Sequence, residues 1–127
     1  MRILITGAAG MVGRKLIARL AKDGTLRGEK ITALDLHDIV PPQAPAMDGV
    51  SVALHTGDLA EANAAESLVA SRPDVVFHLA GIVSGEAEAN FDLGYRVNLD
   101  GTRALFDAIR LAGFAPRVVF KIGRAHV

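Results

Sequence analysis

The 127-residue chain contains no cysteine, and tyrosine occurs once, at Tyr95. The lack of cysteine excludes a disulfide framework, a cysteine-ligated zinc site and a thiol nucleophile. Neither sign of charge is in excess, with fourteen Lys and Arg against fourteen Asp and Glu, so the concentrated basic surface of a nucleic-acid-binding protein is not expected. No apolar run approaches the length of a membrane span, and no charged-then-apolar leader precedes the first strand-like run. The composition predicts a cytoplasmic, globular α/β protein with no nucleic-acid or membrane partner.

Apolar runs typical of buried parallel strands alternate along the chain with segments of helical periodicity. Because parallel strands must be joined by crossovers over a face of the sheet, this alternation predicts a Rossmann-like parallel sheet of five strands with helices on both faces. The predicted strands are 2–6, 30–36, 51–55, 74–79 and 117–120, the predicted helices are 11–21, 59–71 and 91–111, and the proline-containing stretch 39–49 is predicted to be irregular.

Three glycines follow the first predicted strand at a spacing typical of a phosphate-binding turn. They are Gly7, Gly10 and Gly13, in the stretch TGAAGMVG. In such a unit the first glycine permits a tight turn, the second lets the backbone approach a pyrophosphate, and the third lets the helix pack closely on the strand. The helix then directs unpaired N–H groups and its positive dipole end at the phosphates. A purely structural turn is the alternative, whereas the absence of a closing Gly-Lys-Ser/Thr excludes a phosphate-loop NTPase.

An acidic residue, Asp35, lies in the last part of the second predicted strand, twenty-two residues beyond Gly13. A carboxylate at about this distance accepts hydrogen bonds from the adenosine ribose, and its charge repels a 2′-phosphate. The spacing therefore predicts a dinucleotide ligand, NAD rather than NADP. A solvated aspartate at a strand end is the alternative.

Four stretches together resemble the short-chain dehydrogenase/reductase superfamily, in its extended branch of NAD-dependent epimerases and dehydratases. The first is the glycine turn with its preceding threonine, 6–13, and the second is Gly-Asp-Leu at 57–59, which resembles the loop that holds the adenine ring. His-Leu-Ala-Gly at 78–81 resembles the loop beside the nicotinamide half of the cofactor, and Val-Asn-Leu-Asp-Gly-Thr at 97–102 resembles the segment whose asparagine, here Asn98, supports the active site. The resemblance covers residues 1–120.

The resemblance implies a set of cofactor contacts drawn from these motifs and from the acidic residue of the second strand. In this sequence the contacts are Gly7, Gly10, Met11, Val12, Gly13, Asp35, Asp58, Leu59, Leu79, Ala80, Gly81 and Asn98. Each of the polar members also fits a structural role, for example Asp58 as an acid at a helix N-terminus.

The run 81–98 looks like the D-erythronate dehydrogenase group, whose members oxidise the C2 hydroxyl of a four-carbon sugar acid with NAD. On this resemblance Ser84 would contact cofactor or substrate at the nicotinamide rim. Two alternatives remain open: a sugar-nucleotide epimerase or dehydratase, which shares every cofactor motif, and a redox-silent module that binds NAD without turnover.

The superfamily's catalytic groups, a serine and a Tyr-x-x-x-Lys pair, follow the fifth strand in related sequences, and none is identified here. Tyr95 lies in a predicted helix and has Leu99 rather than lysine four residues on. The resemblance therefore implies that a longer parent, a homodimer through the long helix, is the enzyme, and that this chain is inactive. The segment 121–127 departs abruptly from the family pattern, and we expect it to be a non-native tail after the 1–120 domain.

The four histidines, His37, His55, His78 and His126, show no spacing typical of a metal site and no evident pairing with one another or with carboxylates. The sequence therefore predicts no bound metal.

Overall fold

The computed structural model describes residues 1–80 and 91–121, and for residues 91–98 it describes the backbone. Five strands form a parallel sheet in the order β5-β4-β1-β6-β7. This order, in which the first strand lies in the centre and the chain winds outward in both directions, is that of a Rossmann-type domain. The strands of the sheet are β1 (Arg2–Thr6), β4 (Ala33–Asp38), β5 (Ser51–Thr56), β6 (Val75–His78) and β7 (Arg117–Phe120).

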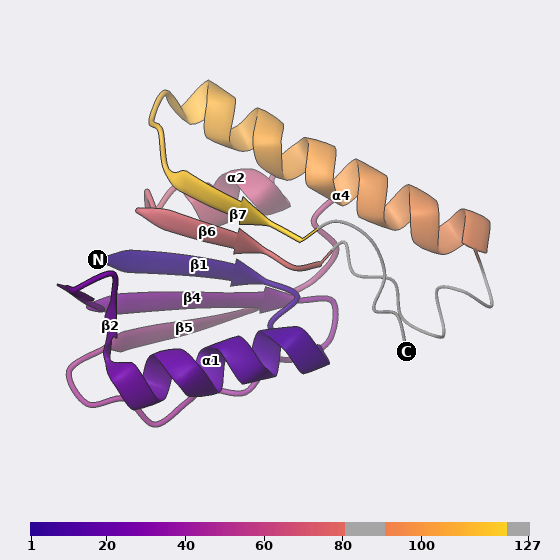
Figure 1. Cartoon of the computed structure of the whole chain (residues 1–127). Helices are drawn as coiled ribbons and strands as arrows, with labels where there is room; N and C mark the ends of the chain where they lie inside the picture. The colour runs from indigo at the N-terminus through magenta and orange to yellow at the C-terminus, as the bar shows by residue number, and fades with distance from the viewer. Residues whose placement is uncertain (81–90, 122–127) are drawn as a thin grey trace.

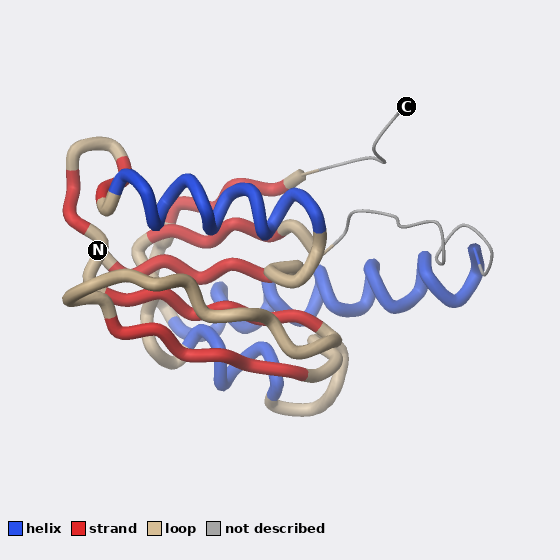
Figure 2. The backbone as a smooth tube through the Cα atoms, turned by 90° about the horizontal axis from the view of Figure 1, so that it is seen from below, coloured by secondary structure: helices blue, strands red, loops and turns tan. Residues whose placement is uncertain are grey.

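Helices cover both faces of the sheet. Helix α1 (Met11–Asp23) lies on one face, and α2 (Ala64–Val69) and α4 (Phe91–Ala112) lie on the other (Figure 1, Figure 2). Each face has its own apolar core, and β1 contributes alternate residues to both, Ile3 and Ile5 towards α1 and Leu4 towards α2 and α4. All three of these side chains have no exposed surface, so β1 is the strand on which the two layers depend.

The fold class predicted from the sequence is therefore confirmed, with helices on both faces of a five-stranded parallel sheet. Helix α1 continues two residues beyond the predicted 11–21 and ends at Asp23, because Gly24 adopts φ 69° and donates its N–H to the carbonyl of Leu20. Helix α2 is shorter than the predicted 59–71, because the turn after Asp58 takes up the residues before Ala64.

The second predicted strand, 30–36, is displaced. Residues before it form a small antiparallel hairpin, β2 (Thr25–Leu26) and β3 (Glu29–Lys30), which the sequence analysis did not predict. The strand of the main sheet begins at Ala33 and continues to Asp38, which pairs with Thr56 of β5. The end of this strand therefore lies three residues beyond Asp35.

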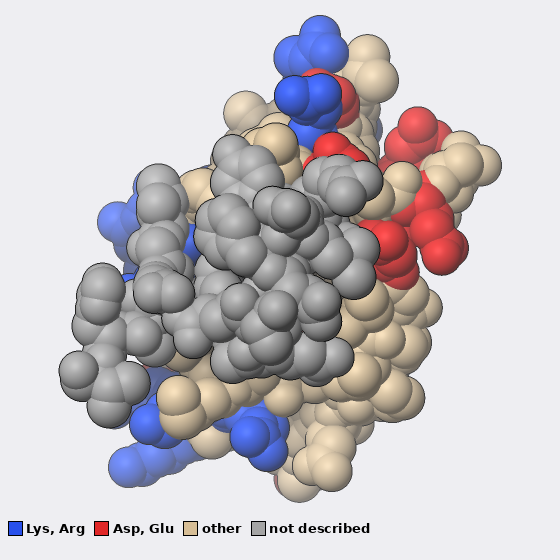
Figure 3. Space-filling model, turned by 90° about the vertical axis from the view of Figure 1, so that its right-hand side faces the viewer, with Lys and Arg blue, Asp and Glu red and all other residues tan. Residues whose placement is uncertain are grey.

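All five strands of the sheet point the same way, so their carboxyl ends meet at one edge, the right-hand side of Figure 1. Figure 3 views the molecule onto this edge. Lys and Arg side chains lie at the left, the bottom and the top of the view, and Asp and Glu side chains gather at the upper right, some of them beside the Lys and Arg at the top. Among the described residues visible there, the Lys and Arg side chains form no continuous basic surface.

No helix in the described ranges combines the length and apolar character needed to cross a membrane.

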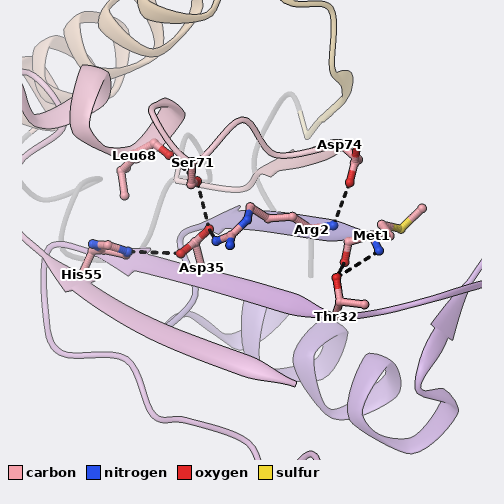
Figure 4. Close-up of polar contacts among 8 residues, drawn as sticks. All are labelled: Met1, Arg2, Thr32, Asp35, His55, Leu68, Ser71 and Asp74. Atoms are coloured by element: carbon pink, nitrogen blue, oxygen red, sulfur yellow. Dashed lines mark hydrogen bonds and ion pairs between the residues drawn. The ribbon is translucent and has the colours of Figure 1, made fainter. Parts of the chain in front are cut away.

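The structure corrects the position expected for Asp35, which is buried in the middle of β4 rather than at the strand's end. Its carboxylate is 3.1 Å from the Arg2 guanidinium of β1, accepts a hydrogen bond of 3.2 Å from the Ser71 hydroxyl, and lies 3.5 Å from His55 Nε2 of β5 (Figure 4). The side chain of Asp35 is only 6% exposed. Asp35 therefore connects β1, β4, β5 and the loop after α2, and it is enclosed rather than directed at the glycine turn.

We predict that Asp35→Ala lowers the free energy of unfolding by about 2 kcal/mol, because Arg2 and Ser71 lose their buried acceptor. The loss should be smaller than for a fully enclosed pair, since the Arg2 side chain is 37% exposed and regains water. Urea denaturation measures the change. The control is Asp23→Ala, which breaks the exposed helical pair with Arg19 and should change stability little; equal losses in the two variants would contradict the assignment.

Candidate functional site: a cofactor cradle at the carboxyl edge of the sheet

The glycine turn connects the end of β1 to the start of α1. Gly7 follows Thr6 with φ 75°, a conformation that favours glycine, and its carbonyl accepts a 3.1 Å hydrogen bond from Gly10 N–H. Gly10 caps α1 with extended backbone and no side-chain hydrogen bond, and the first turn of α1 contains no acidic residue. The turn is therefore tight, and the amino end of a 13-residue helix opens directly onto the carboxyl edge of the sheet.

The three glycines are required for different reasons. A Cβ on Gly7 would lie 2.7 Å from the carbonyl carbon of Leu79, and a Cβ on Gly13 would lie 2.2 Å from the carbonyl oxygen of Gly7. Both distances are too short for any side chain, so the fold itself excludes one. Among the described residues, by contrast, a Cβ on Gly10 would meet only the Gly7 carbonyl oxygen at 3.4 Å, and Gly10 has φ −77°, which any residue can adopt. The fold does not need glycine at position 10, so its bare backbone is best explained by a group that approaches from outside.

The N-terminus of α1 supplies the chemistry for such a group. The first N–H groups of a helix have no acceptor within it, and the helix dipole adds positive potential at this end. Met11, at the first helical position, is 59% exposed, and Gly10 before it is exposed as well. An anion such as a pyrophosphate fits here, on the open side of Gly10.

Asp38, which the sequence analysis missed, provides the carboxylate at the end of β4. One of its oxygens accepts a 2.8 Å hydrogen bond from Ala9 N–H of the glycine turn, and the other accepts one of 2.6 Å from Ile39 N–H. The neighbouring carbonyl of His37 accepts a hydrogen bond from Ala8 N–H. The half-buried carboxylate of Asp38 therefore lies beside the turn, in the position that the sequence analysis gave to Asp35. The signal that could have found it is the irregular, proline-containing stretch that follows directly and ends the strand.

The loop after β5 contains the predicted adenine-contacting residues Asp58 and Leu59. Asp58 Oδ1 accepts a 2.9 Å hydrogen bond from Ala60 N–H, which shapes the turn, and the carboxylate remains partly exposed. The Leu59 side chain is buried under α4, where a Cβ on Gly101 would lie 3.2 Å from Leu59 Cβ. Leu59 could therefore meet a ligand only through its backbone, since its side chain belongs to the core.

The loop after β6 lies against the glycine turn. Leu79 N–H donates to the carbonyl and, at 3.2 Å, to the hydroxyl of Thr6, and Ala80 N–H lies 3.4 Å from the same hydroxyl. Leu79 is 7% exposed and its side chain packs on the α1 side of the core. The predicted residues Gly81 and Ser84 lie outside the described residues; Asn98 lies within α4, and its side chain is outside the described part.

Four polar side chains form a row across the sheet just below its carboxyl edge. In the strand register, Thr6 of β1 pairs with His37 of β4 on one side and with His78 of β6 on the other, and His37 pairs with His55 of β5. Three of the four histidines therefore share this row, and His55 also contacts Asp35, a relation that the spacing of the histidines in the sequence does not reveal. The described residues nevertheless contain no group of three or more side chains suited to hold a metal ion.

Burial keeps the histidines at the centre of this row neutral. Desolvation, together with a smaller contribution from nearby His37, lowers the pKa of His78 to about 4. Desolvation also lowers the pKa of His37, against opposing contributions from Asp38, Asp58 and the backbone of Gly57. His37 Nδ1 is buried without a hydrogen-bond partner among the described residues. Both imidazoles therefore act near neutral pH as uncharged hydrogen-bonding groups.

The fold and the cradle define a dinucleotide-binding domain of the Rossmann type, with a phosphate position at the N-terminus of α1 and an acidic residue at the end of the second strand of the sheet. The model of the NAD dependent epimerase/dehydratase family matches residues 3–122, and the chain belongs to that family. The cofactor predicted from the sequence, NAD, is the cofactor of the family.

Relatives of known function or structure agree with this membership. The chain is 44% identical to D-erythronate dehydrogenase of Cupriavidus necator and 33% identical to D-erythronate dehydrogenase of Haemophilus influenzae, over 94% of this chain in both cases and over 38% and 37% of the relatives. A solved structure described as a nucleoside-diphosphate-sugar epimerase from Agrobacterium tumefaciens is 58% identical with a TM-score of 0.86, over 94% of this chain and 36% of that one. The chain therefore spans little more than a third of the length of these relatives.

We predict opposite effects for alanine at two of the glycines. Gly13→Ala should lower the free energy of unfolding by about 2 kcal/mol or more, because its Cβ overlaps the Gly7 carbonyl. Gly10→Ala should cost less than about 1 kcal/mol, yet weaken NAD binding by roughly tenfold, because the new methyl group occupies the space on which a pyrophosphate would rest. Denaturation and calorimetric titration with NAD measure the two effects; unchanged NAD affinity in Gly10→Ala would mean that the turn is structural only.

We also predict that stability falls as the pH decreases from about 6.5 towards 4. In this window the unfolded chain takes up a proton at His78 and the folded chain does not, so the contribution is complete above pH 6.5 and is lost towards the folded pKa of about 4. The full span corresponds to about 3 kcal/mol. Denaturation curves across this range should show a smaller slope for His78→Asn, with a remainder from His37, whose pKa is also lowered; an unchanged slope would contradict the burial of a neutral His78.

Proposed function

We propose that the chain is the cofactor-binding part of an NAD-dependent oxidoreductase that oxidises the C2 hydroxyl of a sugar acid such as D-erythronate. The observation that carries the substrate class is the 44% identity to D-erythronate dehydrogenase of Cupriavidus necator over 94% of this chain. The open face at Gly10 and the unpaired N-terminus of α1 support the binding of the cofactor.

Each described part of the cradle would have a distinct task. The backbone at Gly10 and the first N–H groups of α1 would hold the pyrophosphate, and Asp38 would accept hydrogen bonds from the adenosine ribose. Asp58 would bond the edge of the adenine ring, and Leu79 and Ala80 would border the nicotinamide half. Bound NAD supplies the hydride acceptor. The groups that handle the substrate proton, a serine and a Tyr-x-x-x-Lys pair, would come from the longer parent, so this chain alone would be inactive.

A sugar-nucleotide epimerase or dehydratase is the second candidate. The 58% identity to the structure described as a nucleoside-diphosphate-sugar epimerase favours it, as does the 34% identity to UDP-glucose 4-epimerase of Mycolicibacterium smegmatis. Because the two candidates use the same cofactor cradle, the choice between them depends on residues beyond it. A redox-silent NAD-binding module is the third candidate, and a parent without turnover would favour it.

The parent would act as a cytoplasmic homodimer in carbohydrate metabolism. The support for a dimer is that α4 carries exposed apolar side chains, Leu99 at 43% and Leu111 at 73%, since exposed apolar side chains favour contact with a second copy.

The substrate assignment is tested by turnover of the purified full-length parent with NAD. D-erythronate should give NADH, followed by absorbance, whereas UDP-glucose should give neither NADH nor UDP-galactose. The isolated 127-residue chain serves as the control and should give no NADH. Interconversion of UDP-sugars by the parent would replace the first candidate with the second.

We predict that Asp38 sets the choice of cofactor. Asp38→Asn in the parent should narrow the preference for NAD over NADP by roughly tenfold, because it removes the charge that repels a 2′-phosphate while leaving an oxygen for Ala9 N–H. The ratio of kcat/KM for the two cofactors measures the change. Asp35→Asn is the matched control and should leave the ratio unchanged, since Asp35 is enclosed by Arg2, Ser71 and His55. A ratio that changes in Asp35→Asn but not in Asp38→Asn would show that Asp35 sets the choice of cofactor.

A further inference from the structure

A chain of hydrogen bonds runs from α4 through the sheet to the glycine turn. Thr102 Oγ1 of α4 lies 2.8 Å from His78 Nε2, and His78 Nδ1 lies 2.6 Å from Thr6 Oγ1. The Thr6 hydroxyl oxygen is in turn 3.2 Å from Leu79 N and 3.4 Å from Ala80 N. Thr6 has no exposed surface and His78 is 1% exposed, so water does not complete these bonds.

The two backbone N–H groups fix the direction of the whole chain. A threonine hydroxyl has one proton to donate and two lone pairs to accept with. Leu79 N–H shares its proton between the Thr6 carbonyl at 3.1 Å and Thr6 Oγ1 at 3.2 Å, and Ala80 N–H lies 3.4 Å from Oγ1. Because both N–H groups can only donate, they occupy the two lone pairs of Thr6 Oγ1. The Thr6 proton then goes to His78 Nδ1, which must be an acceptor, and the single proton of the neutral imidazole lies on Nε2, from which it is donated to Thr102 Oγ1. The lowered pKa of His78, about 4, agrees with a ring that carries one proton.

The opposite tautomer conflicts with the same contacts. With the proton on Nδ1, Thr6 Oγ1 would have to accept three hydrogen bonds, and its own proton would lose the Nδ1 acceptor in a fully buried site. Leu79 N–H would keep the Thr6 carbonyl as its acceptor, so the contact of Ala80 N–H with Thr6 Oγ1 would be the one lost. An unsatisfied buried polar group of this kind is costly, so the acceptor offered by Thr102 helps to decide how the loop after β6 is held.

We propose that His78 and Thr102 are positioning residues for the cofactor cradle, acting through the tautomer of the imidazole. The N–H groups of Leu79 and Ala80 favour the tautomer with the proton on Nε2, and Thr102 stabilises it by accepting that proton. This tautomer keeps both lone pairs of Thr6 available for the loop after β6, and the loop backbone then lies against Gly7, where a Cβ would be 2.7 Å from Leu79. A residue of α4 thus governs the backbone that borders the nicotinamide half of the proposed site.

Aromatic side chains hold the imidazole in the orientation that these bonds need. The ring of Phe120 stacks on His78 with centroids 5.3 Å apart and an interplanar angle of 14°, and Phe106 meets it edge-on at 6.1 Å. These contacts restrict the ring but do not distinguish its two nitrogens. The choice of tautomer is therefore left to the polar partners.

The inference is tested in two steps, and only the second rests on the proposed binding of NAD. Long-range proton–nitrogen correlation spectra of the nitrogen-labelled chain report directly which imidazole nitrogen carries the proton. His78 should show the proton on Nε2 in the unmodified chain and in Thr102→Ser, and a mixture of tautomers in Thr102→Val. A proton on Nδ1 in the unmodified chain would overturn the inference whatever the chain binds.

The second step compares NAD affinity with stability in the full-length parent. Thr102→Val should weaken NAD binding by about fivefold, or 1 kcal/mol, when measured by calorimetry on folded protein, and Thr102→Ser should restore it. Ile109→Val, in the apolar core beneath α4, is the packing control and should lower stability while leaving the tautomer and the NAD affinity unchanged. If Thr102→Val lowers stability but leaves the NAD affinity unchanged, the chain of hydrogen bonds has only a structural role.

If Thr102→Val does not fold, the comparison of Thr6→Val with Thr6→Ser tests the same step. Absence of NAD binding by the unmodified parent would contradict the proposed function and this second step, while the tautomer result would stand by itself.

Discussion

The close approach of backbone segments at the carboxyl end of β1 is the constraint on which the rest of the structure depends. Gly7, the start of α1 at Gly13 and the loop at Leu79 come within distances at which a single added carbon would overlap a neighbour. Contact this close brings the helix N-terminus, the end of β4 and the loop after β6 to one edge. The proposed cofactor position is thus a consequence of how tightly the centre of the sheet is packed.

Two kinds of polar group are buried on the α2 and α4 side of the sheet, and they differ in what they do. Asp35 and Arg2 form an ion pair supported by Ser71 and His55, which joins three strands to the loop after α2. The chain from Thr6 through His78 to Thr102 is uncharged and directional. The ion pair of Asp35 and Arg2 stabilises the sheet at a distance from its carboxyl edge. The chain of hydrogen bonds through His78 reaches the backbone that forms this edge.

The sequence predicted much of this in advance, and its failures have definite causes. The glycine spacing and the apolar runs depend on neighbours close in the chain, so β1, α1 and β7 were predicted within two residues of their observed bounds. The sequence could not tell whether Asp35 or Asp38 lies at the end of the strand, because the end of a strand is set by its pairing partners. The pairing with β5 extends β4 to Asp38 and encloses Asp35. The histidines likewise appeared unrelated, since their common row exists only in the strand register.

The sequence by itself determined the fold class and the position of the glycine turn, because these follow from local periodicity and from glycines close together in the chain, and its motifs carried the resemblance to the family. Only the tertiary structure decided which carboxylate lies beside that turn, that Gly10, unlike Gly7 and Gly13, has room for a Cβ among the described residues, and which way the hydrogen bonds of His78 run. Each of these depends on atoms that are distant in sequence and close in space. How deeply a side chain is buried, how much space lies beside a glycine and which atom donates a hydrogen bond all depend on such contacts, so no single stretch of the sequence determines them.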